Sequence, residues 1–157
     1  MKLNKLSLVM LFSGSLFFQA VGKNEISVNS EVKSVNVESA FQTLPANVKN
    51  FLAKYYPKAT VSKYEAKTTV VGKKYEVKLN NGAEIDFDKN GNWEEISDKQ
   101  GVPTALIPAS IKAYIAKNYK GVKVESIDKE SNKIKVDLMN DIDLEFDKNG
   151  KFLRIDK

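Results

Sequence analysis

The chain of 157 residues contains no cysteine and no histidine, and its single arginine is Arg154. Without cysteine there is no disulfide, no metal–thiolate site, no cysteine nucleophile and no lipid-modified leader. Without histidine, a catalytic triad built on an imidazole base is impossible. A Gly-x-Ser-x-Gly elbow and a phosphate-binding loop are absent too. The sequence therefore predicts a protein that is not an enzyme and uses no cofactor.

Arginine is nearly absent, so the basic residues are lysines, and they alternate with acids along the chain instead of forming a block. Proteins that bind nucleic acid rely on arginine forks and on clustered basic faces. An interspersed pattern is typical of a solvated surface. The net charge of +5 therefore does not indicate a nucleic-acid partner.

The chain begins with the pattern of a secretory signal peptide. Lys2 and Lys5 precede an apolar run from Leu6 to Phe18, and Ala20 and Gly22 fit the small-residue rule for cleavage. The run is shorter than the ~18 residues that a membrane-spanning helix needs. We expect cleavage after Gly22 and a periplasmic or secreted mature protein that is not attached to a membrane; a retained anchor is the alternative.

The rest of the chain is a tandem repeat. The stretch from Val77 to Ile96 returns between Val136 and Ile155, and both copies contain Phe-Asp-Lys-Asn-Gly at the same place. Self-similarity of this kind indicates two copies of one structural unit. The predicted organisation is a signal peptide at 1–22, an N-terminal tether at 23–43, repeat 1 at 44–98, a linker at 99–106 and repeat 2 at 107–157.

The pattern of each repeat predicts one helix followed by four strands. In repeat 1, Pro45 opens a helix whose apolar residues recur at helical spacing as far as Tyr55, and Pro57 ends it. Alternating apolar and charged residues, separated by Asn-Gly turns, then predict strands; these cover Ala59 to Thr69, Lys73 to Leu79, Ala83 to Phe87 and Trp93 to Ile96. The predicted fold class is α+β, with two tandem helix-plus-four-stranded antiparallel sheet units.

The same register predicts how each repeat packs. Phe51 is expected to meet Phe87 beneath the first helix, and Tyr114 to meet Phe146 beneath the second, because each lies on the apolar face of its element. Units of this size without disulfides are marginally stable alone. If their strands join edge to edge, the apolar linker is expected to be buried between the repeats, at Val102, Leu106 and Ile107.

One family carries this pattern. Leu-Pro-x-x-Val-x-x-Phe-Leu, followed by Tyr-Glu-Val-x-Leu-x-Asn-Gly-x-Glu-Ile-Asp-Phe-Asp-x-x-Gly-x-Trp and a closing Leu-Glu-Phe-Asp-x-x-Gly, resembles the PepSY-like proteins of the Gram-negative envelope. Their tandem fold is similar to that of β-lactamase inhibitor protein. The resemblance covers residues 44–156. It implies a monomeric exported module that binds or inhibits another envelope protein, whose identity stays open.

Three aromatic residues are the candidate protein-binding set: Tyr64, Trp93 and Phe152, together with the 65–74 hairpin. Trp93 and Ile96 are three positions apart, and residues at that spacing in a regular strand face opposite ways. One of the two would then lie on the face away from the helix, where a partner could reach it. The alternative is burial of both, through a bulge at the preceding glycine.

Acidic residues raise two further possibilities. Asp86, Asp88 and Asn90 resemble the first half of a calcium loop, but the position that needs a bidentate glutamate is Ser97. A tight turn, in which Asp and Asn bond their own backbone, is the favoured interpretation, with a structural or cation-scavenging envelope protein as the alternative function. The carboxylates Glu84, Asp86, Glu94 and Glu95 suit cross-strand charge pairs better than the acid/base pair of a small hydrolase, the least favoured function.

Overall fold

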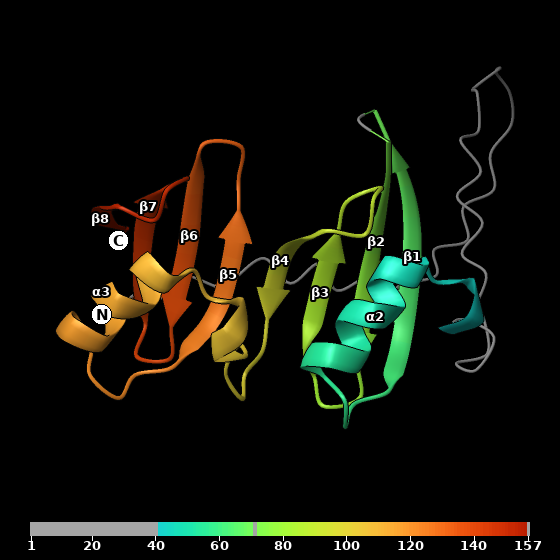
Figure 1. The fold of residues 1–157 in the computed structure, drawn as a ribbon, viewed down its shortest axis with the longest axis horizontal. Coiled ribbons are helices and arrows are strands. Elements are labelled where there is room, and N and C mark those ends of the chain that lie inside the picture. The colour runs from blue at the N-terminus through green and yellow to red at the C-terminus, as the bar shows by residue number, and fades with distance from the viewer. Residues whose placement is uncertain (1–40, 71, 157) are drawn as a thin grey trace, which may run out of the picture. The chain divides into compact units, whose positions relative to one another are not determined.

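The computed structural model describes residues 41–70 and 72–156, so the predicted signal peptide and most of the predicted tether lie outside the described residues. The described residues all belong to one compact unit, Ser34–Lys157. Its elements follow the predicted order (Figure 1): α2 (Ala46–Tyr55), β1 (Val61–Thr69), β2 (Gly72–Leu79), β3 (Glu84–Phe87), β4 (Trp93–Ser97), η1 (Thr104–Leu106), α3 (Ala109–Asn118), β5 (Val124–Lys129), β6 (Lys133–Leu138), β7 (Ile142–Asp147) and β8 (Phe152–Asp156).

The eight strands form one antiparallel sheet in sequence order, with β1 at one edge and β8 at the other. The two repeats meet where β4 pairs with β5, through Glu95 with Asp128 and Ser97 with Ser126. The predicted four-stranded units are therefore the two halves of one continuous sheet. Joining them covers one exposed edge of each half, and exposed edges are where isolated sheets aggregate. The α+β class is confirmed.

Both helices lie on the same face of the sheet (Figure 1). Each begins directly after a proline, Pro45 or Pro108, whose missing N–H would have had no partner there. Val48 and Leu52 are the buried residues of α2, as the helical spacing predicted. No helix in residues 41–70 and 72–156 is long and apolar enough to cross a membrane.

The turns β3–β4 and β7–β8 each touch the first turn of a helix. Gly91 has φ +79°, and a Cβ placed there would lie 2.9 Å from the Cβ of Asn47. Gly150, at φ +80°, lies in the same position against Ser110. The Asn47 side chain donates a hydrogen bond to the Asn90 carbonyl at 2.9 Å. Glycine is therefore needed twice over, for the left-handed backbone and for the approach of the helix.

Four strands contain one extra residue. Register shifts of the β-bulge kind occur next to Ser62 in β1, Glu94 in β4, Glu125 in β5 and Leu153 in β8. An extra residue reverses the alternation of faces, so residues three apart come to the same side. Trp93 and Ile96 thus share the helix-covered face. A bulge does bring both residues to the same face, as the alternative prediction had it. The bulge lies between the two residues, however, and not at the preceding glycine.

The register aligns two rows across the sheet, one on each face. The helix-covered face carries an apolar row of directly paired residues: Tyr64, Val77, Ile85, Ile96, Ile127, Val136, Leu144 and Ile155. The next residue along each strand lies in a charged row on the helix-free face: Glu65, Glu76, Asp86, Glu95, Asp128, Lys135, Glu145 and Arg154. One face is thus a core and the other is a charged surface.

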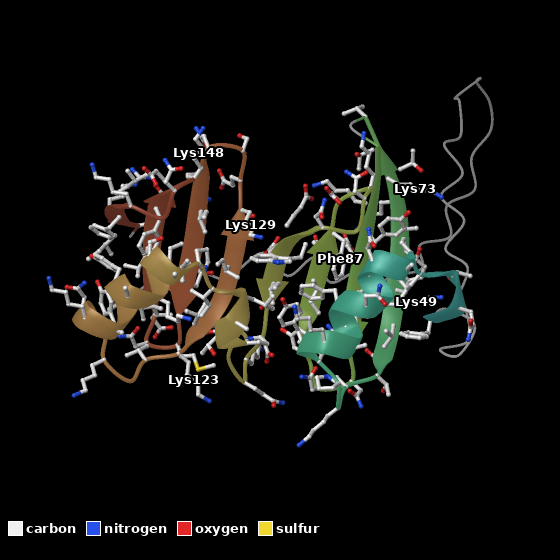
Figure 2. The ribbon with its side chains drawn as sticks, in the orientation of Figure 1. Lys49, Lys73, Phe87, Lys123, Lys129 and Lys148 are labelled. Carbon is white, nitrogen blue, oxygen red and sulfur yellow. The ribbon has the colours of Figure 1, made fainter. Side chains whose placement is uncertain are left out.

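The core contains both predicted aromatic pairs. Phe51 of α2 meets Phe87 edge to face, with ring centroids 5.2 Å apart; Phe87 is labelled beside α2 in Figure 2. Tyr114 of α3 meets Phe146 in the same way at 5.4 Å. Phe87 and Phe146 are completely buried. Both pairings predicted from the sequence are confirmed.

The linker between the repeats is part of the core. Val102, Leu106 and Ile107 are buried, with 4%, 8% and 8% of their surface exposed. The Val102 N–H donates to the Val124 carbonyl at 2.9 Å, which ties the linker to the beginning of β5. The prediction that these apolar residues are buried once the repeats join is confirmed.

Candidate binding surfaces

Five acids stand in line on the helix-free face. Glu65, Glu76, Asp86, Glu95 and Asp128 are directly paired across β1 to β5, each with an acid on the neighbouring strand. Side chains directly opposite on adjacent strands lie close together, so like charges there destabilise the sheet. We call these five residues the acidic row.

The centre of the acidic row has perturbed acidity. Burial is the main cause that raises the pKa of Asp86 to about 6, followed by the charges of Glu76 and Glu95, while Lys67 and Lys74 act in the opposite direction. The pKa of Glu95 is raised in the same way, by burial first and then by Asp128. The lysines therefore neutralise the middle of the row incompletely.

Lysines do neutralise Glu65 and Glu76, the acids at the β1 end of the row, and two further acids beside the row. Lys67 pairs with Glu76 at 2.5 Å, and Lys74 pairs with Glu94 at 2.5 Å. Lys78 pairs with Glu84. These contacts confirm that Glu84 and Glu94 form cross-strand charge pairs, as the sequence predicted. For Asp86 and Glu95 the predicted charge pairs are wrong, because an acid lies directly opposite each of them. Asp86, Glu95 and Asp128 make no ion pair within the part of the chain that the structure describes.

Glu145 continues the charged row in repeat 2, and it is compensated. Its side chain is only 6% exposed and accepts from Lys133 and Arg154, each at 2.8 Å. Hydrogen bonds from Arg154 and then Lys133 lower the pKa of Glu145 to about 2. The chain's one arginine thus neutralises an acid on the helix-free face. The like-charged stretch is confined to β1–β5.

The calcium-like sequence is a turn. The Asp88 carboxylate accepts from the backbone N–H groups of Asn90 and Asn92, at 2.9 and 2.8 Å. Asp147 makes the same two contacts in repeat 2. Asp88 is committed to the turn, while Asp86 belongs to the sheet face. The turn interpretation is confirmed, and no group of three or more metal-ligating side chains occurs within residues 41–70 and 72–156.

The three aromatics of the candidate binding set all lie on the helix-covered face. Tyr64 pairs with Val77 and stacks on Tyr75, with centroids 6.2 Å apart. Phe152 stacks on Tyr114 at 4.5 Å. Trp93 pairs with Phe87 and packs against the core. All three are partly buried, and none lies on the helix-free face; their role in protein binding stays a prediction.

Lys129 of β5 is a site residue that the sequence did not single out. Its ammonium nitrogen lies 3.1 Å from the centroid of the Trp93 ring. Although the side chain reaches the surface, burial of the ammonium group lowers the pKa of Lys129 to about 8. No local pattern could have shown this contact, because it depends on the pairing of β4 with β5 across the two repeats.

The carboxylates considered for hydrolysis do not line a groove. Asp86 and Glu95 are directly opposite on the helix-free face. Neither residue lines either of two grooves on the described chain, one between the linker and α3 and the other between α2 and the β3–β4 turn. A hydrolase needs its acid and base to line a cleft that holds the substrate. These carboxylates therefore do not support one.

Comparison with known proteins agrees with this architecture. The family described as "Putative beta-lactamase-inhibitor-like, PepSY-like" matches residues 27–84 and 73–154. The chain belongs to this PepSY-like family. Two matched stretches agree with a tandem repeat, although their boundaries differ from the predicted repeats at 44–98 and 107–157. No curated protein matches the chain.

Solved structures of similar proteins come from Bacteroides. A "putative calcium-regulated periplasmic protein" of Bacteroides thetaiotaomicron is 33% identical, with a TM-score of 0.70, and the match covers 74% of this chain and 93% of that one. A "putative periplasmic protein" from Bacteroides vulgatus is 31% identical, with a TM-score of 0.71, over 74% of this chain and 93% of that one. The PepSY-like fold assigned here is thus found in proteins described as periplasmic.

Proposed function

We propose that this PepSY-like protein is an exported, non-enzymatic module that binds or inhibits another envelope protein through the helix-free face of its sheet. The acidic row is the observation that supports this. Placing acids opposite one another on five strands costs stability, and the neighbouring acids add to burial in raising the pKa values of Asp86 and Glu95. A sheet selected only for stability would alternate the charges there.

The chemistry of the row specifies the partner's surface. A protein that presents lysine or arginine side chains to Asp86, Glu95 and Asp128 relieves their mutual repulsion and gains charge complementarity. The Lys67–Glu76 pair at one end of the row and the Lys74–Glu94 pair beside it suit a polar rim. The partner is therefore a protein with a basic patch, and binding is weakened by salt.

The test compares capture by a neutralised row with capture by the wild type. The tagged protein, and its variant Asp86→Asn/Glu95→Gln/Asp128→Asn, are used to capture proteins from a periplasmic extract at low and high salt. Asp141→Asn, in the β6–β7 turn, is the matched control for loss of a carboxylate away from the row. A partner retained by wild type and by the control, released by salt and lost with the triple variant, supports the proposal. Equal capture by the triple variant refutes it.

Cation binding is the second candidate function. It is favoured by the relative from Bacteroides thetaiotaomicron described as calcium-regulated, which is 33% identical to this chain. Carboxylate oxygens are ligands that calcium prefers, so Asp86 is the candidate ligand, although no three acids of the described residues are grouped closely enough to hold a metal ion together. Calorimetric titration with calcium decides between the two, because weak extracellular sites saturate at ~1 mM. A heat of calcium binding that is seen in the wild type and lost in Asp86→Asn would support a cation site. The absence of any heat with the wild type would exclude one.

A further inference from the structure

A groove of about 390 Å³ lies on the helix side of the sheet, between α2, the β3–β4 turn and the β4–β5 junction. This volume is in the range of small-molecule sites. Three aromatic side chains supply its apolar surface: Phe51 and Tyr55 from α2, and Trp93 from β4. Phe51 and Tyr55 are themselves in contact, with ring centroids 4.9 Å apart. These three aromatic side chains are only partly buried, and together they form an aromatic wall of the groove.

The charged groups of the groove are all of one sign. Lys54 and Lys129 line it, and no aspartate or glutamate does. Neither lysine makes an ion pair within the described residues, 41–70 and 72–156, whereas Lys67, Lys74 and Lys78 on the other face are all paired. Both ammonium groups lie over aromatic rings, Lys54 at 5.0 Å from Tyr55 and Lys129 at 3.1 Å from Trp93.

The Lys129 side chain is exposed at the surface, and its ammonium group is held against the Trp93 ring. Partial desolvation disfavours the ammonium form and lowers its pKa, while the face of the indole ring favours the cation. An aromatic face compensates a partly desolvated cation less fully than a carboxylate does. An anion that enters the groove would therefore improve the surroundings of Lys129, whereas a neutral ligand would not.

Repeat 2 has the same elements, but its aromatic residues pack differently at the corresponding place. There Phe152, the counterpart of Trp93, stacks on Tyr114 at 4.5 Å with the rings nearly parallel, and so fills the corresponding space. No strand pairs with the outer edge of β8 among the described residues, so nothing corresponds to Lys129. The groove belongs to the junction: α2 and β4 come from repeat 1, and Lys129 comes from repeat 2.

We propose that this groove binds a small organic carboxylate with a flat ring. The ring packs on the aromatic wall of Phe51, Tyr55 and Trp93, and the carboxylate pairs with Lys129 and Lys54. The Asn50 side chain, which also lines the groove and makes no hydrogen bond to the described chain, is available to the ligand's polar edge. The site is on the face opposite the acidic row, so it does not depend on the proposed protein-binding function.

Trp93 provides the readout, because it is the only tryptophan of the chain. The full-length mature protein is titrated with benzoate, and its fluorescence is recorded at constant ionic strength with excitation where benzoate does not absorb. Benzamide has the same ring without the charge, and acetate has the charge without the ring. We expect a saturable change with benzoate, with a Kd of about 1 to 10 mM for so small a ligand. Benzamide and acetate are each expected to bind at least about tenfold more weakly, since each lacks one of the two contacts.

Variants assign the response to the groove. Lys129→Gln should weaken benzoate binding about tenfold or more, the scale of one ion pair in a partly buried site, and Lys129→Arg should restore it. Lys117→Gln in α3, which occupies the position of Lys54 in repeat 2, is the matched control and should bind like wild type. Circular dichroism establishes that each variant is folded.

Three results would overturn the proposal: no saturable response to benzoate, an equal response to benzamide, or unchanged affinity in a folded Lys129→Gln. Asp86→Asn should leave benzoate binding intact. The two proposals can therefore be refuted separately. Benzoate binding can be absent while the acidic row still captures a protein, and protein capture can be absent while the groove still binds benzoate.

Discussion

At the scale of single residues, the surroundings of Asp86 and of Lys129 oppose their charged forms. Asp86 is opposed by burial and by the acids beside it, and Lys129 by burial alone. Both pKa shifts depend on residues of other strands, which bury the charged group or place a like charge beside it. Composition and spacing could suggest that Asp86 was on a strand surface, but not that acids would be opposite it on both sides, because that depends on pairing.

Asp86 should destabilise the protein at neutral pH. Its folded-state pKa is about 6, against an ordinary value of 3.8, so the native state holds more protons between these values. Stability therefore falls as pH rises from about 4 to about 6 and stays lower above that. Asp86→Asn should raise the free energy of unfolding at pH 7 by about 1 kcal/mol, discounted for solvent screening. Urea denaturation at pH 4 and pH 7 measures this.

Asp141→Asn is the control for that experiment, because Asp141 lies in a turn with positive φ that asparagine tolerates equally well. It should change stability little at either pH. A loss of stability in Asp86→Asn at pH 7 would show that the carboxylate is compensated in solution.

Lys129 should titrate near pH 8 and be visible through Trp93. Its ammonium lies over the indole ring, so loss of the proton changes the environment of the only tryptophan. Because the folded pKa is about 8 and the unfolded value is near 10.5, the unfolded state holds more protons between them, and stability rises with pH across this window. A fluorescence pH titration should show the step in wild type and not in Lys129→Gln. A step that persists in the variant would assign it to another group.

At the scale of elements, the hairpin turns and helices were predictable because their signals are local. Pro45, the helical spacing of Val48 and Leu52, and the Asp-Lys-Asn-Gly turns all act within a few residues of themselves. The four bulges were not predictable in position. A bulge forms where the partner strand leaves one residue unpaired, and the sequence of one strand does not contain its partner's register.

The two buried phenylalanines hold the helices to the sheet. Phe87→Ala and Phe146→Ala each remove a completely buried ring that meets an aromatic of the overlying helix edge to face, so each should cost about 3 to 5 kcal/mol. That is a large part of the stability of a domain of this size. Leu153→Ala, at a β8 position that is 51% exposed, is the control and should cost far less. An unchanged denaturation midpoint in either phenylalanine variant would contradict the packing.

Gly91 tests the contact between the β3–β4 turn and α2. Alanine at this position meets both the left-handed backbone and the Asn47 side chain, 2.9 Å from the new Cβ. Gly82 also has positive φ, but nothing lies within 4 Å of a Cβ there. Gly82→Ala should therefore cost about 1 to 2 kcal/mol for the backbone alone, and Gly91→Ala should cost more. Equal losses of stability in the two variants, measured by thermal denaturation, would mean that α2 moves away from the new methyl group at little cost.

At the scale of the whole molecule, the two repeats should unfold together. β4 pairs with β5, and Val102 and Ile107 are buried between the repeats. Each repeat alone is of marginal size and would expose a strand edge. We expect one calorimetric transition for residues 44–157, and a fragment cut at Gln100 that is poorly folded or aggregates. Two separable transitions, or a soluble folded fragment, would show that the repeats are independent.

The sequence by itself determined the repeat, the α+β class, the order of the elements and the aromatic pairs of the core. These follow from periodicity and turn chemistry, which act between near neighbours, and from a second copy that repeats the register. Only the tertiary structure decided which face each aromatic occupies, that acids line up across β1–β5, and that Lys129 lies over Trp93. Those depend on bulges and on pairing between strands far apart in the chain, where a shift of one residue exchanges the two faces of the sheet.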